Sequence, residues 1–143
     1  MHKLGHLVVP TARQGLHEVT AEIARWVDSV GLQEGLCTLF VKHTSASLMI
    51  QENADPSARR DLERWMSRLV EEGDPLFLHT SEGPDDMPAH VRAALTATSL
   101  SIPIFGGRLE LGTWQGIFLW EHRHAGGRRS IALHASGDLP PRA

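Results

Sequence analysis

Residues 41–56 read VKHTSASLMIQENADP and hold the end of one predicted strand, a second strand and the start of a helix. An apolar run ends at Val41 and resumes at Leu48, and the polar segment 43–47 between them places three hydroxyl side chains beside one histidine. Asp55 can accept hydrogen bonds from the first free N–H groups of a helix, and Pro56 suits the first helical position because a donor there has no partner. The stretch therefore predicts a strand, a polar break, a strand and a helix.

The hydrophobic pattern on either side predicts a mixed α+β domain with two or three helices. Besides the elements above, it predicts strands at 3–9 and 35–42 and helices at 16–30, 56–70 and 88–95. After residue 99, three apolar runs are separated by Gly106-Gly107 and Gly126-Gly127, and such pairs between strands are typical of hairpins. We expect one domain over residues 1–143, with an antiparallel meander in its last third.

Composition excludes several classes of function. The 143 residues carry a net charge of −3 and a pI near 6.3, whereas nucleic-acid binders are strongly basic. No apolar run approaches the ~18 residues of a membrane span, and the N-terminus lacks the pattern of a signal peptide. The only cysteine, Cys37, cannot form an internal disulfide. We expect a soluble cytoplasmic protein that binds neither nucleic acid nor membrane.

Nine histidines in so short a chain make a metal or acid–base site worth testing. His43, His79 and His90 lie at predicted element ends or in loops, where functional side chains concentrate. If the three imidazoles meet, they form a divalent-metal site with an open position for water or substrate. The alternative for segment 43–47 is an ordinary turn whose hydroxyls satisfy their own backbone, and residue types alone favour this alternative.

Two pairs of charged residues have both a structural and a functional interpretation. Asp85 and Asp86 precede a short helix, so one of them is expected to cap it, while the other can hold Mg²⁺ on a diphosphate. Glu121 and Arg123 point to the same side of a predicted strand, where they form a salt bridge or an arginine site for phosphate. His122 points to the other side and is expected in an exposed hairpin.

Trp114 and Gln115 lie between Gly112 and Gly116, two glycines that indicate a bulge or a close backbone approach in a strand. Trp114 can stack on a heteroaromatic ring whose edge Gln115 hydrogen-bonds. The alternative is a core tryptophan with a polar residue on the opposite face, as strand alternation predicts. The residue pattern leaves both interpretations open.

Four long segments resemble, in order, the YjbQ family, which is also called the secondary thiamine-phosphate synthase family. They are HTSASLMIQENADPSARRDLERW (43–65), DDMPAHVRAAL (85–95), GRLELGTWQGIFLWEHR (107–123) and GGRRSIAL (126–133). The resemblance extends from about residue 4 to residue 135 and leaves 136–143 as a short tail. Thr80 departs from the Asn or Asp that commonly follows the family histidine matching His79.

This resemblance implies an antiparallel β-sandwich that assembles as a homotrimer and has a weak or secondary thiamine-phosphate synthase activity. The reaction joins hydroxymethylpyrimidine diphosphate to thiazole phosphate and releases pyrophosphate. A divalent metal held by histidines, Zn or Mg, and a small phosphorylated molecule are the expected ligands. The expected catalytic residues are His43, Gln115, Glu121 and Arg123, the substrate- or anion-binding residues Thr44, Ser45, Ser47, Asn53 and Trp114, and the metal ligands His43, His79 and His90. A non-catalytic anion- or metal-binding protein and a metal-dependent phosphate-ester hydrolase are the alternatives.

Overall fold

The computed structural model describes residues 1–142, which form three helices and eight strands. The helices are α1 (Thr20–Val30), α2 (Pro56–Leu69) and α3 (Asp86–Leu95). The strands are β1 (His2–Thr11), β2 (Gly15–Glu18), β3 (Glu34–Val41), β4 (Ala46–Glu52), β5 (Ser99–Phe105), β6 (Arg108–Leu109), β7 (Gln115–Glu121) and β8 (Gly127–Asp138). This combination of helices with antiparallel strands confirms the predicted α+β class.

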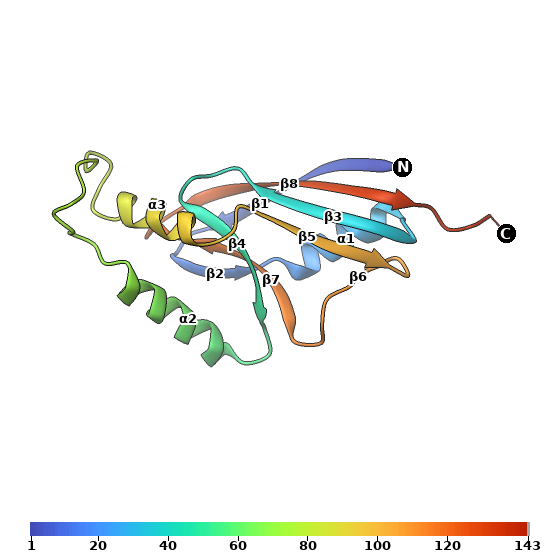
Figure 1. The fold of residues 1–143 in the computed structure, drawn as a ribbon, viewed down its shortest axis with the longest axis horizontal. Coiled ribbons are helices and arrows are strands. Elements are labelled where there is room, and N and C mark those ends of the chain that lie inside the picture. The colour runs from blue at the N-terminus through green and yellow to red at the C-terminus, as the bar shows by residue number, and fades with distance from the viewer. Residues whose placement is uncertain (143) are drawn as a thin grey trace.

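The strands form two antiparallel sheets, one in the order β1-β8-β3-β5-β6 and one in the order β2-β7-β4. Helices α2 and α3 lie together at the end of the molecule opposite the C-terminus (Figure 1). Both sheets and α1 contribute to one buried core, which includes Ile23, Leu39, Ile117 and Ile131. Alternate residues of β3 are buried, as expected for a strand with one face on the core.

Helix α2 begins where its sequence predicts. The Oδ1 atom of Asp55 accepts a hydrogen bond from the Ser57 amide at 2.9 Å, and Pro56 is the first helical residue. Met66, on the buried side of the helix, packs with Leu16 and other apolar residues in a second, smaller cluster. Local capping and an apolar stripe therefore suffice to define this helix.

The segment predicted as one helix over 16–30 divides into β2 and α1. Leu16 pairs with Trp120 of β7, and its side chain is buried in the smaller cluster rather than on the α1 face. The helix begins at Thr20, whose hydroxyl accepts a hydrogen bond from the Ile117 amide at 2.8 Å. Pairing with β7 thus overrides the local helical periodicity of residues 16–18.

The predicted meander is wrong beyond its first hairpin. Gly106 and Gly107 form the β5–β6 turn, with φ values of 61° and 78°. Strand β7, however, pairs with β2 and β4, whereas β8 pairs with β1 and β3. Gly126 and Gly127 therefore carry the chain from one sheet to the other, because both edges of β7 are already paired.

The C-terminal residues extend the larger sheet. Residues 136–138, which the family resemblance left as part of a short tail, continue β8, and Asp138 is the register partner of Glu34 in β3. Ala143, the last residue of the predicted tail, lies outside the described residues. Within residues 1–142, no helix combines the length and the apolar character needed to cross a membrane.

Candidate functional site

Two of the predicted metal-binding histidines, His79 and His90, converge on the carboxylate of Asp86. Asp86 and His90 are one turn apart on α3, and His79 reaches them from the loop that joins α2 to α3. The Nε2 atoms of His79 and His90 lie 3.2 Å and 3.1 Å from Asp86 Oδ2. One ligand atom of each residue lies within 4.8 Å of the others, which is the size of a metal site. We call these three residues the histidine–aspartate group.

Arg123 fixes the orientation of this group. Its Nη1 donates to Asp86 Oδ1 and its Nε to Asp85 Oδ2, each at 3.0 Å, and Nη2 donates to the Glu82 carbonyl at 2.9 Å. The hydrogen bonds from Arg123 lower the pKa of Asp85 to about 2. The predicted side-chain cap at the start of α3 is wrong, because both carboxylates bind Arg123 instead.

The protonation of His90 bears on what the group can hold. Its Nδ1 lies 3.1 Å from the Thr44 carbonyl oxygen, which can only accept, so Nδ1 carries a proton. In the neutral ring Nε2 then carries no proton, and it lies 3.1 Å from Asp86 Oδ2, a buried acceptor that receives no hydrogen bond. A cation or a ring proton stabilises two acceptor atoms at this distance. Two imidazoles and one carboxylate are a ligand set that Zn²⁺ uses, so the residues fit a metal.

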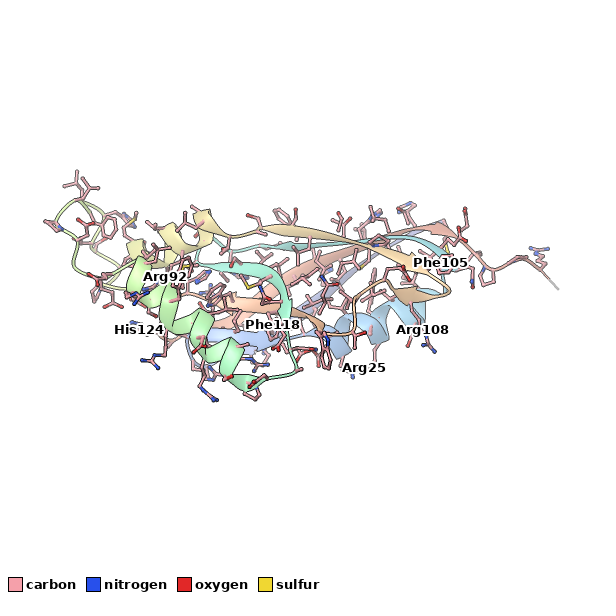
Figure 2. All side chains as sticks on the ribbon, turned by 60° about the horizontal axis from the view of Figure 1, so that its bottom comes forward. Arg25, Arg92, Phe105, Arg108, Phe118 and His124 are labelled. Carbon is pink, nitrogen blue, oxygen red and sulfur yellow. The ribbon has the colours of Figure 1, made fainter. Side chains whose placement is uncertain are left out.

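Arg92 anchors the helix that carries two of the three candidate ligands. It is buried, and it donates to the Val70 carbonyl at 2.7 Å and to the His122 carbonyl at 3.3 Å. Figure 2 shows Arg92 and His124 at the end of the molecule where α2 and α3 lie. This cation therefore ties α3 both to the end of α2 and to the residue that follows β7.

His43 lies outside the histidine–aspartate group. Strand β3 ends at Val41, and the His43 ring then provides an acceptor for the next free amide of β8, because Ser130 N donates to Nε2 at 2.8 Å. The Nδ1 atom faces Arg129 Nη1 at 3.5 Å. Burial, and after it the charge of Arg129, lower the pKa of His43. The structure thus gathers Asp86, and not the predicted His43, with the other two histidines.

Glu121 pairs with Arg129 and not with the predicted partner Arg123. The buried Glu121 carboxylate accepts from Arg129 Nε at 2.6 Å and Nη2 at 2.7 Å, and from the Thr11 hydroxyl at 2.6 Å. Burial opposes ionisation of Glu121, but the hydrogen bonds outweigh burial and its pKa is lowered. Sequence reasoning missed Arg129, because a basic residue at the start of a strand does not reveal its partner.

The three hydroxyl side chains of segment 43–47 do not share a hydrogen-bond partner. Ser45 Oγ accepts from Arg129 Nη2 at 3.1 Å, Ser47 Oγ is hydrogen-bonded to His122 Nε2 at 2.8 Å, and Thr44 is exposed. His122 is buried, and burial lowers its pKa to about 4. The predicted exposed hairpin at His122 is therefore wrong, because the chain is still buried at this residue, which follows the end of β7.

The contacts of three further predicted residues do not involve the histidine–aspartate group: Trp114, Gln115 and Asn53. Trp114 lies in the loop before β7 and is 63% exposed, so it is not the core tryptophan of the structural alternative. Gln115 Oε1 accepts from the Gly112 amide at 2.8 Å, and Asn53 Nδ2 donates to Glu18 Oε2 at 2.9 Å. These hydrogen bonds do not involve the histidine–aspartate group, and the role of the three residues in substrate binding stays a prediction.

An open groove connects the surroundings of His43 with those of His90. Its volume is about 790 Å³, and its lining includes Lys42, His43, Thr44 and His90. A smaller cavity of about 250 Å³ borders His79. Of the candidate metal ligands, His90 thus adjoins a groove that can hold a small molecule, and His79 adjoins a separate cavity.

Comparison with known proteins places the chain in a family. The family model described as UPF0047 protein YjbQ-like matches residues 6–138. The chain is 52% identical to the UPF0047 protein sll1880 of Synechocystis sp. over 133 residues, which are 93% of this chain and 90% of that protein. It is 44% identical to the UPF0047 protein YjbQ of Escherichia coli O157:H7 over 128 residues, 88% of this chain and 92% of that protein.

Solved structures agree with the family model. A YbjQ-like protein from Sulfolobus solfataricus matches with a TM-score of 0.88 and 25% identity, and the match covers 96% of this chain and 99% of that chain. A YjbQ/UPF0047 family protein from Clostridium acetobutylicum matches with a TM-score of 0.84 and 28% identity, over 92% and 99% of the two chains. Sequence and fold together establish that the chain belongs to the YjbQ-like UPF0047 family.

Proposed function

We propose that this protein binds a divalent metal ion through His79, Asp86 and His90 and acts on a small phosphorylated molecule in the adjoining groove. The observation that carries the proposal is the buried Oδ2 atom of Asp86, which receives no hydrogen bond while two imidazole nitrogens face it. A buried carboxylate oxygen without a partner is costly unless a cation or a proton compensates it.

The reaction proposed first is the thiamine-phosphate synthase reaction, which the family resemblance implies. In this reaction the C–O bond between the pyrimidine methylene and its diphosphate breaks, a C–N bond to the thiazole nitrogen forms, and pyrophosphate leaves. A bound divalent cation supplies charge stabilisation for the departing diphosphate. Lys42 and Thr44 line the same groove and offer an ammonium group and a hydroxyl to a phosphate.

The ligand set favours zinc over magnesium. Imidazole nitrogen suits Zn²⁺ and other first-row transition metals, whereas Mg²⁺ prefers oxygen ligands and retains several waters. Two of the three candidate ligands are imidazoles, and His90 donates its Nδ1 proton to a backbone carbonyl, the usual outer contact of a ligating histidine. We therefore propose Zn²⁺ as the physiological ion.

A metal-dependent phosphate-ester hydrolase is the second candidate. The observation that favours it is the number of ligands, because three protein ligands leave a fourth zinc position for a water molecule, as in catalytic zinc sites. A hydrolase would break the P–O bond of its ester and transfer the phosphoryl group to water, so no thiazole partner would be needed.

One assay separates these candidates. Metal-free protein is supplied with Zn²⁺ or Mg²⁺ and hydroxymethylpyrimidine diphosphate, with and without thiazole phosphate, and pyrophosphate, phosphate and thiamine phosphate are measured. Transfer predicts thiamine phosphate only with both substrates, and hydrolysis predicts phosphate release without thiazole. Asp86→Asn should abolish either activity, while Asp61→Asn, on the exposed face of α2, should not. Metal binding without any turnover would contradict the enzymatic proposal and favour a binding protein.

Assembly and location are proposed from the same resemblance. Exposed apolar side chains on the outer face of the larger sheet, Leu4, Val8, Leu36 and Phe40, support association into the expected homotrimer. The core shared by the two sheets supports a β-sandwich arrangement, and a cytoplasmic location is proposed with it. Light scattering after size exclusion tests the trimer, and Phe40→Glu should shift it toward monomer.

A further inference from the structure

A second polar cluster borders the groove beside the histidine–aspartate group. It consists of His43, Ser45 and Arg129, and its members come from the end of β3, from the polar break before β4 and from β8. His43 lines the groove itself. Arg129 donates two hydrogen bonds to the buried carboxylate of Glu121, so its guanidinium has a fixed position.

The hydrogen bond to Ser130 defines the tautomer of His43. A backbone amide can only donate, so Nε2, which lies 2.8 Å from Ser130 N, carries no proton. In the neutral ring the proton is therefore on Nδ1. This Nδ1–H faces Arg129 Nη1 at 3.5 Å, and the guanidinium is also only a donor. The two groups thus approach each other as two donors without an acceptor between them.

The other hydrogen bonds of Arg129 leave Nη1 available. Its Nε and Nη2 donate to Glu121, and Nη2 also donates to Ser45 Oγ at 3.1 Å. Because Ser45 accepts this bond, its own O–H proton is left to donate, and within residues 1–142 the side-chain hydrogen bonds give it no acceptor. Donors from three segments therefore lie around the Arg129 guanidinium, and these hydrogen bonds give Nη1, His43 Nδ1 and the Ser45 O–H no acceptor.

We propose that Arg129 Nη1, His43 Nδ1 and the Ser45 hydroxyl bind an oxygen of a phosphate or diphosphate group. The assignment of phosphate rests on the proposed function, whereas the need for an anionic oxygen rests on the donors alone. Lys42, which lines the same groove, adds a positive charge at its exposed rim. His90 lines this groove too, so one member of the subsite, His43, and one candidate metal ligand face the same ligand space.

This inference replaces Arg123 as the phosphate-binding arginine that the sequence suggested. Each of the three Arg123 nitrogens already donates to Asp85, Asp86 or the Glu82 carbonyl. Arg129, in contrast, keeps Nη1 without an acceptor among these hydrogen bonds. Arg123 is thus a positioning residue for the candidate metal ligand, and Arg129 contacts the substrate anion.

The test uses the full chain, freed of metal with a chelator, and inorganic diphosphate as the probe. Calorimetry gives the diphosphate affinity of wild type, Arg129→Lys and Arg128→Lys. Lysine keeps the charge opposite Glu121 but lacks Nη1, so Arg129→Lys should weaken binding about tenfold, the usual effect of losing a charge-assisted hydrogen bond. Arg128→Lys makes the same change at an exposed neighbour and should leave the affinity unchanged.

Histidine ¹⁵N spectra provide a second readout that needs no arginine variant. In wild type, His43 should be the Nδ1–H tautomer, and diphosphate should shift its Nδ1 resonance; His43→Gln identifies the signal. Equal affinities of Arg129→Lys and wild type, or an Nε2–H tautomer at His43, would overturn the proposal. The diphosphate measurements contain no metal, so their outcome does not depend on the candidate metal centre. A protein that binds diphosphate but fails to bind added Zn²⁺ would refute the metal centre and leave this subsite intact.

Discussion

Arg123 Nη1 donates a hydrogen bond to Asp86 Oδ1 at 3.0 Å, and this contact leaves the other carboxylate oxygen facing two histidines. Asp86 is buried, so its orientation is set by this bond and by the backbone of α3. An arginine on the segment after β7 thus controls a candidate metal ligand on α3. Partners that orient a ligand in this way commonly contribute strongly to metal affinity.

Replacing Arg123 should therefore weaken metal binding without removing any candidate ligand. We expect Arg123→Gln to bind Zn²⁺ about 10- to 100-fold more weakly than wild type, as measured by competition with a coloured chelator. Arg25→Gln is the matched control, since the Arg25 side chain is 71% exposed. An unchanged Zn²⁺ affinity in Arg123→Gln would show that Asp86 needs no such support.

The pH dependence of stability should carry a contribution from His122. Burial lowers its pKa from 6.5 to about 4, so the unfolded state binds a proton first as the pH falls. The free energy of unfolding should therefore be fully present above pH 6.5 and decrease between pH 6.5 and about 4, by about 3 kcal/mol for this residue.

Urea unfolding at pH 7 and pH 4.5 measures this contribution. His122→Gln should lose less stability than wild type over this interval, whereas His6→Gln, at an exposed position, should lose as much as wild type. Equal losses in wild type and His122→Gln would mean that the buried imidazole does not govern acid sensitivity.

Gly126 allows the close approach of Glu121 to the turn between the sheets. A methyl group at this position would overlap Glu121 Oε1 and would lie 2.5 Å from Thr11 Oγ1. We expect Gly126→Ala to lower the free energy of unfolding by about 1–3 kcal/mol, the usual cost of overpacking. Urea denaturation measures it, with Gly112→Ala as the comparison because only the end of the Gln115 side chain is near there. Equal stability of the two variants would contradict the expected overlap.

The Glu121–Arg129 pair should be sensitive to loss of the carboxylate charge. Both side chains are largely inaccessible, with 0% and 11% exposure. Glu121→Gln leaves the guanidinium without a counter-charge, so we expect a loss of about 3 kcal/mol in the free energy of unfolding. Glu110→Gln, at an exposed position, should change stability by less than about 0.5 kcal/mol. A loss in Glu121→Gln as small as that of the control would argue against a structural ion pair.

Elements defined by local signals were predictable from the sequence. Asp55 and Pro56 set the start of α2, and Gly106-Gly107 set the β5–β6 turn. The Gly126-Gly127 pair gave the same local signal, but the partners of β7 and β8 depend on residues far away in the chain. Strand pairing of this kind cannot be predicted from the turn alone.

The candidate site was predictable only in part for the same reason. His79 and His90 stood out by their positions near a loop and a helix start, but Asp86 had a sufficient local explanation as a cap. Its actual partner, Arg123, is 37 residues away. Arg129 likewise meets His43 only through the pairing of β3 with β8. The charged partners were therefore the least predictable part of the site.

A cobalt titration tests the central claim, that His79, Asp86 and His90 form one metal centre. Co²⁺ replaces Zn²⁺ in such sites and reports its ligands through visible absorption. Metal-free wild type should develop the bands of a low-coordinate nitrogen–oxygen site and saturate at about one ion per chain. Asp86→Asn, which keeps the shape of the side chain, should remain colourless. Identical bands in both proteins, or no bands in wild type, would contradict the account.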